Sequence, residues 1–476
     1  MCVKPASRWL ALAILLVMGA SVRLYSLGAE SLWLDEVFSL RLSELSFDEF
    51  WDAIRRDTHP PLFPLLLHFW ITIFGTSEFA LRLPSVLCSI LAIGLLWDIA
   101  RKARISTWAR NAGVGAACLS PLLIAHAQEV RPHVLLMVLG IASLSLFLKL
   151  RHRFSWAGAL GLVGVNAAIL YTQYLGACLI LAEVLTLFVS WLRSWQVEGG
   201  RFAWIGIFVG SGVLFLPWLP SFADQLAASQ EQMAWLEKRG WLGILGDFRL
   251  YTGPARSGFG WLGLSLLLGL TLIGVSRGTG PGFTRTAIVL WVCVGIGIPL
   301  LLSFGLRRPI PIARATLATA LVIFLLAGAG LERLGRARLI LAGLLSILLI
   351  WGTVQYYVKA QKRPWRQAAT FIQNESRGPE PAIFCAPAGR VPYRYYEPES
   401  TRPLERLDWG LSERQLLDGL RRATRGRPRF WLVLSYLENH DAIRVRDAAL
   451  ALGYRIRTEH PFWKLTLIHY ERDSGE

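Results

Sequence analysis

The chain has 476 residues, of which 54% are hydrophobic and 12% aromatic, including twenty tryptophans. A composition this apolar is typical of a polytopic membrane protein and excludes an ordinary soluble globule. The formal net charge of +17 does not indicate nucleic acid, because many Lys and Arg lie in short gaps between apolar runs, where membrane orientation and lipid phosphates explain them. The six cysteines form no CxxC motif and lie mostly in apolar runs, so neither a disulfide framework nor a thiolate metal site is predicted.

The first apolar run, residues 9–27, is long enough to cross a bilayer, which takes about 20 residues. Lys4 and Arg8 precede it and predict a cytoplasmic N-terminus. No convincing small-residue cleavage site follows, so we interpret the run as an anchor rather than a cleaved signal peptide. Two helices are then predicted on the outer surface of the membrane. In residues 35–55, acidic residues alternate with apolar residues at near-helical spacing, and the apolar run 61–74 is short for a full crossing. For the second, a tilted span is the alternative.

Ten further apolar runs predict membrane-spanning helices, for eleven in total. They lie at about residues 79–100, 109–126, 133–149, 155–172, 175–192, 203–221, 259–276, 285–305, 315–331 and 338–357. With these spans, short basic loops such as KLRHR fall in the cytoplasm. The polar loops AHAQEVRPH and GLRRPIPIARA, and the C-terminal tail, fall outside.

After the last apolar run the hydropathy drops, and Pro, Arg and Glu become frequent. Alternating helix and strand patterns over residues 358–476 predict a small extracytoplasmic α/β domain with a mainly parallel sheet. It follows an all-α membrane domain over residues 1–357. No phosphate-binding glycine motif follows any of the strands, so no nucleotide is assigned. A lid or docking domain without chemistry of its own is the plainer interpretation of this tail.

The first candidate site residues are the paired carboxylates Asp35 and Glu36, which follow the first span. Apolar residues surround them, and a carboxylate in such a setting is costly to charge unless it has a partner. A solvated surface pair is the alternative. His59 precedes two prolines, and the first of them restricts it to an extended conformation. A site residue and a simple hydrogen-bonding residue are equally compatible with this position.

Two polar loops supply further candidates. AHAQEVRPH carries Glu129 and Arg131 between two strongly apolar spans, where charges tend to pair with one another or to bind a ligand. GLRRPIPIARA places Arg307 and Arg314 on the outer side of the membrane, against the usual orientation of positive charge. A guanidinium group binds phosphate oxygens in a bidentate manner, which suggests a lipid phosphate, and interfacial snorkelling is the alternative.

These motifs together resemble a known family. WLDE, HPPLFPLLLHFWITIFGTSEFALRLPS, AQEVRPHVLL and IARATLATALVIFLLAG are similar to the bacterial relatives of the dolichyl-phosphate-mannose protein mannosyltransferases. These are GT-C class membrane glycosyltransferases, which include the lipid A aminoarabinose transferases. The resemblance covers roughly residues 8 to 360. It implies a cavity formed by the first and second external loops, in a multi-pass protein of a bacterial-type cytoplasmic membrane.

The resemblance also implies an activity, which is sugar transfer from a polyprenyl-phosphate-linked donor to a hydroxyl of a lipid, polysaccharide or protein acceptor. Asp35 falls at the family's catalytic acid and would be the general base, with Glu36 beside it and His59 at a basic family position. Arg131 and Arg314 would stabilise the leaving phosphate. Direct displacement would invert the anomeric centre, whereas a covalent intermediate needs a second carboxylate, such as Glu129. No cofactor is assigned. Some family members use a divalent metal, but this chain has no obvious set of metal ligands, so the involvement of a metal is left undecided.

Two other classes of protein compete with this interpretation. A lipid-linked sugar flippase or transporter would also have about eleven spans, but it should show charged or broken spans at the bilayer midplane and often internal repeats. No convincing repeat is present, and the polar clusters lie at the outer face. A non-enzymatic scaffold with a periplasmic binding tail leaves Asp35, Arg131 and Arg314 unexplained.

Overall fold

The computed structural model describes residues 5–232, 241–253, 258–276, 282–305, 312–359, 362–399, 401–407, 411–424, 426–435 and 439–472. These residues form two compact units, and each is described by itself. The first unit comprises Met1–Leu27 and Leu42–Lys359, and the second comprises Gly28–Arg41 and Ala360–Glu476. The second unit therefore joins a short segment near the N-terminus to the C-terminal part of the chain.

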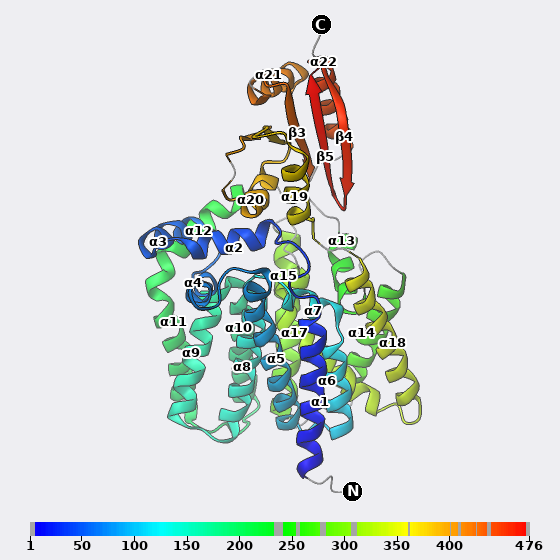
Figure 1. Cartoon of the computed structure of the whole chain (residues 1–476). Helices are drawn as coiled ribbons and strands as arrows, with labels where there is room; N and C mark the ends of the chain where they lie inside the picture. Colours follow the sequence, from blue (N-terminus) through cyan, green and yellow to red (C-terminus); the bar gives the residue numbers. More distant parts are fainter. Residues whose placement is uncertain are drawn as a thin grey trace. The chain divides into compact units, whose positions relative to one another are not determined.

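The first unit is a helical bundle (Figure 1). Its longer helices are α1 (Pro5–Leu24), α5 (Glu78–Lys102), α6 (Thr107–Cys118), α8 (His133–His152), α9 (Trp156–Thr172), α10 (Ala177–Leu192), α11 (Gly200–Phe215), α14 (Gly258–Ser276), α15 (Gly282–Gly305), α17 (Leu317–Glu332) and α18 (Ala337–Val358). Shorter helices are α3 (Phe47–Arg56), α4 (Leu62–Phe74), α7 (Pro121–Ala127), α12 (Leu219–Gln232), α13 (Trp241–Gly246) and α16 (Ile312–Ala315). All eleven predicted spans are therefore helical over most of their described residues.

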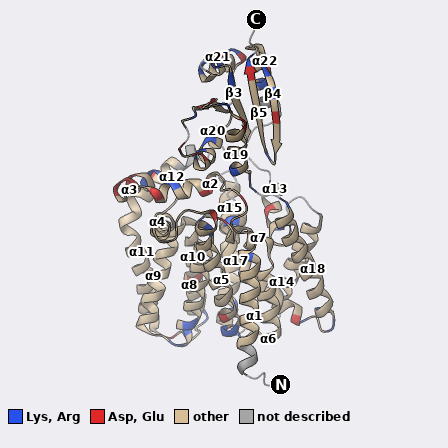
Figure 2. Ribbon diagram, viewed as in Figure 1, with Lys and Arg blue, Asp and Glu red and all other residues tan. Residues whose placement is uncertain are grey.

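Length and composition indicate which helices could cross a membrane. Within the described residues, seven helical stretches are long and apolar enough to cross a bilayer: 78–102, 133–152, 174–192, 200–228, 258–276, 282–305 and 337–358. Four shorter apolar helices lie at 9–24, 62–74, 156–172 and 317–332. Figure 2 shows Lys, Arg, Asp and Glu mainly near the ends of the bundle's helices, whose middle parts are largely free of them. This distribution is expected where the middle of each helix lies in hydrocarbon.

Two predicted helices are broken in the structure. The predicted span 109–126 is divided into α6 and α7, because Pro121 opens α7 and the preceding Ser120 is extended. The predicted surface helix 35–55 is divided into α2 (Leu34–Glu44) and α3, because Ser46 and Glu49 form a capping box that starts a new helix. The prediction of one continuous helix in each of these stretches is therefore wrong. Helix α4 has 13 residues, about 20 Å of helix, which is shorter than the hydrocarbon core.

Helix α17 forms the centre of the first unit. Every residue from Leu317 to Leu331 is buried, as expected for a helix that is apolar on all sides. It approaches α6 at Gly328, where an added Cβ would overlap the carbonyl oxygen of Ala109. It approaches α14 at Gly330, where a Cβ would overlap the carbonyl oxygen of Leu270. Small residues at such crossings let membrane helices pack closely.

The second unit contains a five-stranded sheet between two helical layers. Its elements are α19 (Trp365–Glu375), β1 (Ala382–Phe384), α20 (Pro387–Tyr396), β2 (Leu404–Arg406), α21 (Glu413–Thr424), β3 (Arg429–Ser435), α22 (Asn439–Ala451), β4 (Tyr454–Phe462) and β5 (Leu465–Arg472). Alternate β3 residues face opposite layers, so that Trp431 packs with α19 and α20 while Phe430 packs with α21 and α22. The predicted C-terminal α/β fold is confirmed.

The sheet is mixed rather than mainly parallel. Its strand order is β2-β1-β3-β5-β4, with β1 parallel to both neighbours and β5 antiparallel to both of its neighbours. The prediction of a mainly parallel sheet overlooked β4, whose charged sequence RIRTEHPF did not suggest a strand. Because only Trp463 and Lys464 separate β4 from β5, the two strands must pair as an antiparallel hairpin.

Candidate active site

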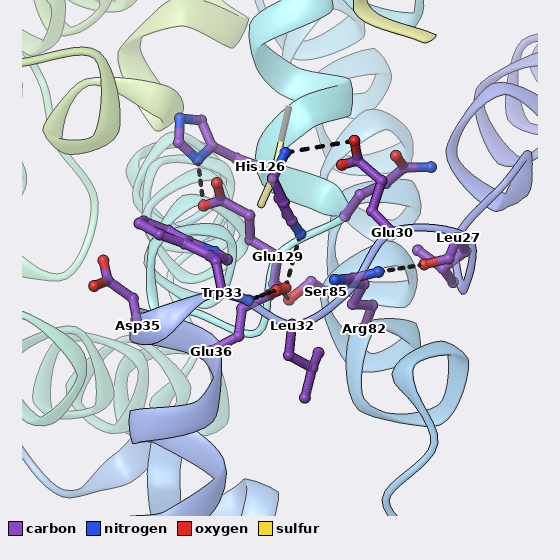
Figure 3. A network of polar contacts seen from close by, with 12 residues as sticks. Leu27, Glu30, Leu32, Trp33, Asp35, Glu36, Arg82, Ser85, His126 and Glu129 are labelled. Carbon is purple, nitrogen blue, oxygen red and sulfur yellow. Dashed lines mark hydrogen bonds and ion pairs between the residues drawn. The ribbon is translucent and has the colours of Figure 1, made fainter. Parts of the chain in front are cut away.

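In the second unit, Asp35 and Glu36 lie in the first turn of α2, where the helix dipole favours negative charge. Glu36 is fully buried. Its Oε2 accepts a hydrogen bond from the Trp33 backbone N–H at 3.3 Å, and its Oε1 lies 3.0 Å from Lys362 Nζ. Asp35 is only partly buried, and Figure 3 shows its carboxylate pointing away from that of Glu36. Adjacent carboxylates thus have different environments, and Asp35 is the more accessible of the two.

In the first unit, His59 links two charged side chains. Its Nε2 lies 3.3 Å from Nη2 of Arg131, and its Nδ1 lies 2.9 Å from Thr58 Oγ1 and 3.6 Å from Asp57 Oδ2. Because a guanidinium group only donates hydrogen bonds, Nε2 must accept from Arg131, which places the ring proton on Nδ1 beside Asp57 and Thr58. Asp57, His59 and Arg131 therefore form a row in which each side chain orients the next.

Asp57 itself has a perturbed carboxyl group. Burial alone would raise its pKa, but hydrogen bonding and charge from His59, the Thr58 backbone N–H and the charge of Arg131 outweigh burial and lower the pKa below its usual range. The negative charge of Asp57, 3.6 Å from Nδ1, favours a proton on that nitrogen of His59. The orientation of Arg131 therefore depends on a carboxylate that the sequence analysis did not identify.

The second polar loop adds another pair to the first unit. His126 Nδ1 donates to Glu129 Oε2 at 3.0 Å, as Figure 3 shows, and the backbone carbonyl of Glu129 accepts from Ser85 Oγ at 2.7 Å. The ring of His126 also meets the ring of His133 edge to face, with 5.9 Å between their centroids. Through these contacts the loop holds Glu129 in a defined position.

Arg314, in α16, joins the same part of the first unit. The positive charges of Arg314 and Arg131 both act on His133, at the start of α8. Two guanidinium groups, of Arg131 and Arg314, thus lie near His133, and Arg131 also contacts His59. This part of the unit is called the cationic region below, and Glu129 is connected to it through His126. The candidate Arg307 lies outside the described residues.

A neighbouring residue, Gln128, has a structural role. Its Nε2 donates to the backbone carbonyls of Arg23 and Tyr25 at 2.8 Å, and its Oε1 accepts from Tyr356 at 3.0 Å. These bonds join the end of α7 to the ends of α1 and α18. The same end of α1 is fixed by Arg82, which donates to the carbonyl of Leu27 at 2.8 Å (Figure 3).

Three participants were missed from the sequence. Asp57 had a local signal, since it lies two residues before His59 and in front of two prolines. His126 lies at helical spacing from Glu129. Lys362 had no signal, because it is 326 residues from Glu36.

Within the described residues, no group of three or more His, Cys, Asp or Glu side chains is arranged to hold a metal ion.

Comparisons with known proteins address the fold and the family. Residues 58–220 match the family model described as dolichyl-phosphate-mannose-protein mannosyltransferase. No curated protein sequence matches the chain significantly. The structure is similar to crystal structures of ArnT from Cupriavidus metallidurans in the apo state (15% identity, 98% of both chains, TM-score 0.61) and bound to undecaprenyl phosphate (14%, 98% of both chains, 0.59). It is also similar to the oligosaccharyltransferase AglB from Archaeoglobus fulgidus in complex with an inhibitory peptide and a dolichol-phosphate (12%, 87% of this chain and 62% of that chain, 0.51).

The resemblance predicted from the motifs is thereby confirmed, and the structural similarity to ArnT also covers the residues after 360, which the motifs did not cover. The chain is a multi-pass membrane protein with the GT-C glycosyltransferase fold, and its residues 58–220 match the dolichyl-phosphate-mannose-protein mannosyltransferases.

Proposed function

We propose that this protein transfers a sugar from a polyprenyl-phosphate-linked donor to an acceptor hydroxyl on the extracytoplasmic face of the cytoplasmic membrane. The observation that carries the proposal is the cationic region of the first unit. There the Asp57–His59 pair orients Arg131, and the positive charges of Arg131 and Arg314 both act on His133. Guanidinium groups suit phosphate oxygens. Two structures of the same fold hold such lipids, undecaprenyl phosphate in ArnT and dolichol-phosphate in AglB.

The proposed reaction is a single displacement. The acceptor oxygen forms a bond to the anomeric carbon while the bond from that carbon to the phosphate oxygen breaks. Asp35 takes the acceptor proton, and the polyprenyl phosphate leaves as an anion. A positioned general base contributes about 10²–10⁴-fold to such a step. Arg131 and Arg314 stabilise the charge that develops on the phosphate, and the anomeric configuration inverts.

The assignment of the base to Asp35 rests on the different environments of the two neighbouring carboxylates. Glu36 is fully buried and contacts Trp33 and Lys362, whereas Asp35 is partly accessible. We therefore give Glu36 a supporting role. Glu129, held by His126, is the carboxylate that a two-step reaction through a covalent intermediate would require.

The lipid-linked sugar flippase is the less favoured alternative, because the fold and the family match both lead to glycosyltransferases.

Mass spectrometry of envelope glycolipids and glycoproteins, from cells with and without this protein, tests the proposal and identifies the sugar and its carrier together. We expect one class of acceptor to lose a sugar mass increment. Unchanged acceptors in every fraction would contradict transfer.

A further inference from the structure

The segment that carries Asp35 is built into the C-terminal unit. Residues 28–41 cluster with residues 360–476 rather than with the membrane bundle that flanks them in the sequence. An ion pair joins the two segments, between Glu36, which is fully buried, and Lys362, whose side chain is 9% exposed. Glu36 adjoins Asp35 in the chain, so a residue beyond the last membrane helix fixes the catalytic motif.

The start of helix α19 binds the same segment. Pro364, the residue before α19, makes no side-chain cap. Instead, Ser31 Oγ accepts from the Arg366 backbone N–H at 3.1 Å and donates to Gln367 Oε1 at 3.2 Å. A serine more than 300 residues away thus satisfies an amide that a helix normally leaves unpaired at its start.

Two further residues hold the backbone of the segment. The hydroxyl of Tyr396, the last residue of α20, accepts from the Leu32 backbone N–H at 2.6 Å. The guanidinium of Arg366 donates to the backbone carbonyl of Gly28 at 3.3 Å. Backbone groups on both sides of Ser31 are therefore bonded to C-terminal side chains, only a few residues before Asp35.

We infer that Lys362 and Tyr396 are positioning residues for the transfer reaction. Residues 360–476, called the C-terminal unit here, then set the orientation of Asp35 and are more than a lid. This inference rests on the proposed function. Lys362 acts through Glu36, which fixes the first turn of α2, and Tyr396 acts through Leu32. Loss of either contact lets the segment move, and a displacement of the base by about 1 Å can cost about 10²-fold in rate.

The test uses the full-length protein in nanodiscs and the lipid-linked sugar pool extracted from cells that lack it. We expect Lys362→Met and Tyr396→Phe to lower kcat by about 10-fold or more, within the range for misplaced groups. The donor KM and the binding of undecaprenyl phosphate stay unchanged, because the cationic region is not altered.

Lys464→Met is the matched control, since Lys464 is exposed in the same unit. The double variant Glu36→Gln/Lys362→Met should be less impaired than Lys362→Met alone, because it leaves no buried charge unpaired.

Hydrogen–deuterium exchange at the amides of residues 29–40 gives a readout that needs no activity. We expect faster exchange in Lys362→Met and Tyr396→Phe, and no change in Lys464→Met. Unchanged exchange in both variants, with or without a loss of rate, would overturn the inference and leave the proposed function standing. If Asp35→Asn keeps the full rate while exchange responds as expected, the segment is positioned by the C-terminal unit, but the proposed base is wrong.

Discussion

At the scale of single residues, the environment of each candidate site group is set by its neighbours. Glu36 is buried against Lys362, whereas its neighbour Asp35 stays partly accessible. Arg131 is oriented by His59, which is held in turn by Asp57. In each case, a group with defined partners restricts a second group that is assigned to the substrate.

The two arginines of the cationic region should act on the donor rather than on the acceptor. We expect Arg314→Ala to raise the donor KM with little change in the acceptor KM, because a phosphate contact is lost. Arg131→Lys should give an intermediate loss, since it keeps the charge but loses the planar fork of donors. Steady-state kinetics with donor and acceptor varied separately measures both effects. An unchanged donor KM in Arg314→Ala would remove that residue from the site.

Asp57 should give the folded protein an acid-dependent part of its stability. The pKa of Asp57 is lowered from the usual 3.8, so its stabilising contribution is complete above that value and is lost as the pH falls through the lowered folded-state pKa. Asp57→Asn should therefore unfold at a lower temperature than the wild type at neutral pH, and the difference should narrow below about pH 4.

Thermal unfolding in detergent, followed by tryptophan fluorescence over a range of pH, measures this difference. Asp52→Asn is the control, because the Asp52 side chain is 72% exposed. A difference between Asp57→Asn and wild type that stays constant into the acid range would show that the Asp57 charge contributes nothing.

At the scale of helices and strands, close packing of the central helix α17 depends on glycine. A Cβ at Gly330 would overlap the Leu270 carbonyl oxygen, so Gly330→Ala should separate α17 from α14 and destabilise the fold by about 1–3 kcal/mol. Gly269→Ala, also in α14, is the matched control, because no atom lies within 4 Å of its Cβ position. Thermal unfolding of the two variants checks this prediction. Equal stability would show that the crossing tolerates a methyl group.

Sequence patterns predicted most of the elements because apolar runs report directly on burial. The patterns failed where a proline ends a helix inside an apolar run, as at Ser120–Pro121. They also failed where a strand is rich in charged residues, as in β4. The candidate site residues Asp35, His59 and Arg131 could be proposed from the sequence because short motifs carry them. Lys362 and Tyr396 were not, because their roles depend on long-range contacts that leave no periodic or local signal.

At the scale of the whole molecule, the order of apolar and basic segments predicts a cytoplasmic N-terminus and an extracytoplasmic C-terminus. Reporter fusions at Lys102 and at Glu476 should therefore report opposite compartments, with Lys102 in the cytoplasm, because the basic loop after α5 is retained there. A reporter in the cytoplasm at both positions would divide the polar loops between the two sides of the membrane and contradict the proposed orientation.

The most direct measurement is consumption of the lipid-linked sugar pool by the purified protein and its Asp35→Asn variant. We predict that the wild type releases polyprenyl phosphate and that Asp35→Asn, which keeps the shape but not the proton acceptor, is slower by about 10²-fold or more while remaining folded. Glu36→Gln should cost less. If Asp35→Asn is fully active and Glu129→Gln is inactive, the base is Glu129. If Asp35→Asn, Glu36→Gln and Glu129→Gln are all fully active, or the wild type consumes no lipid-linked sugar, the glycosyltransferase mechanism is contradicted.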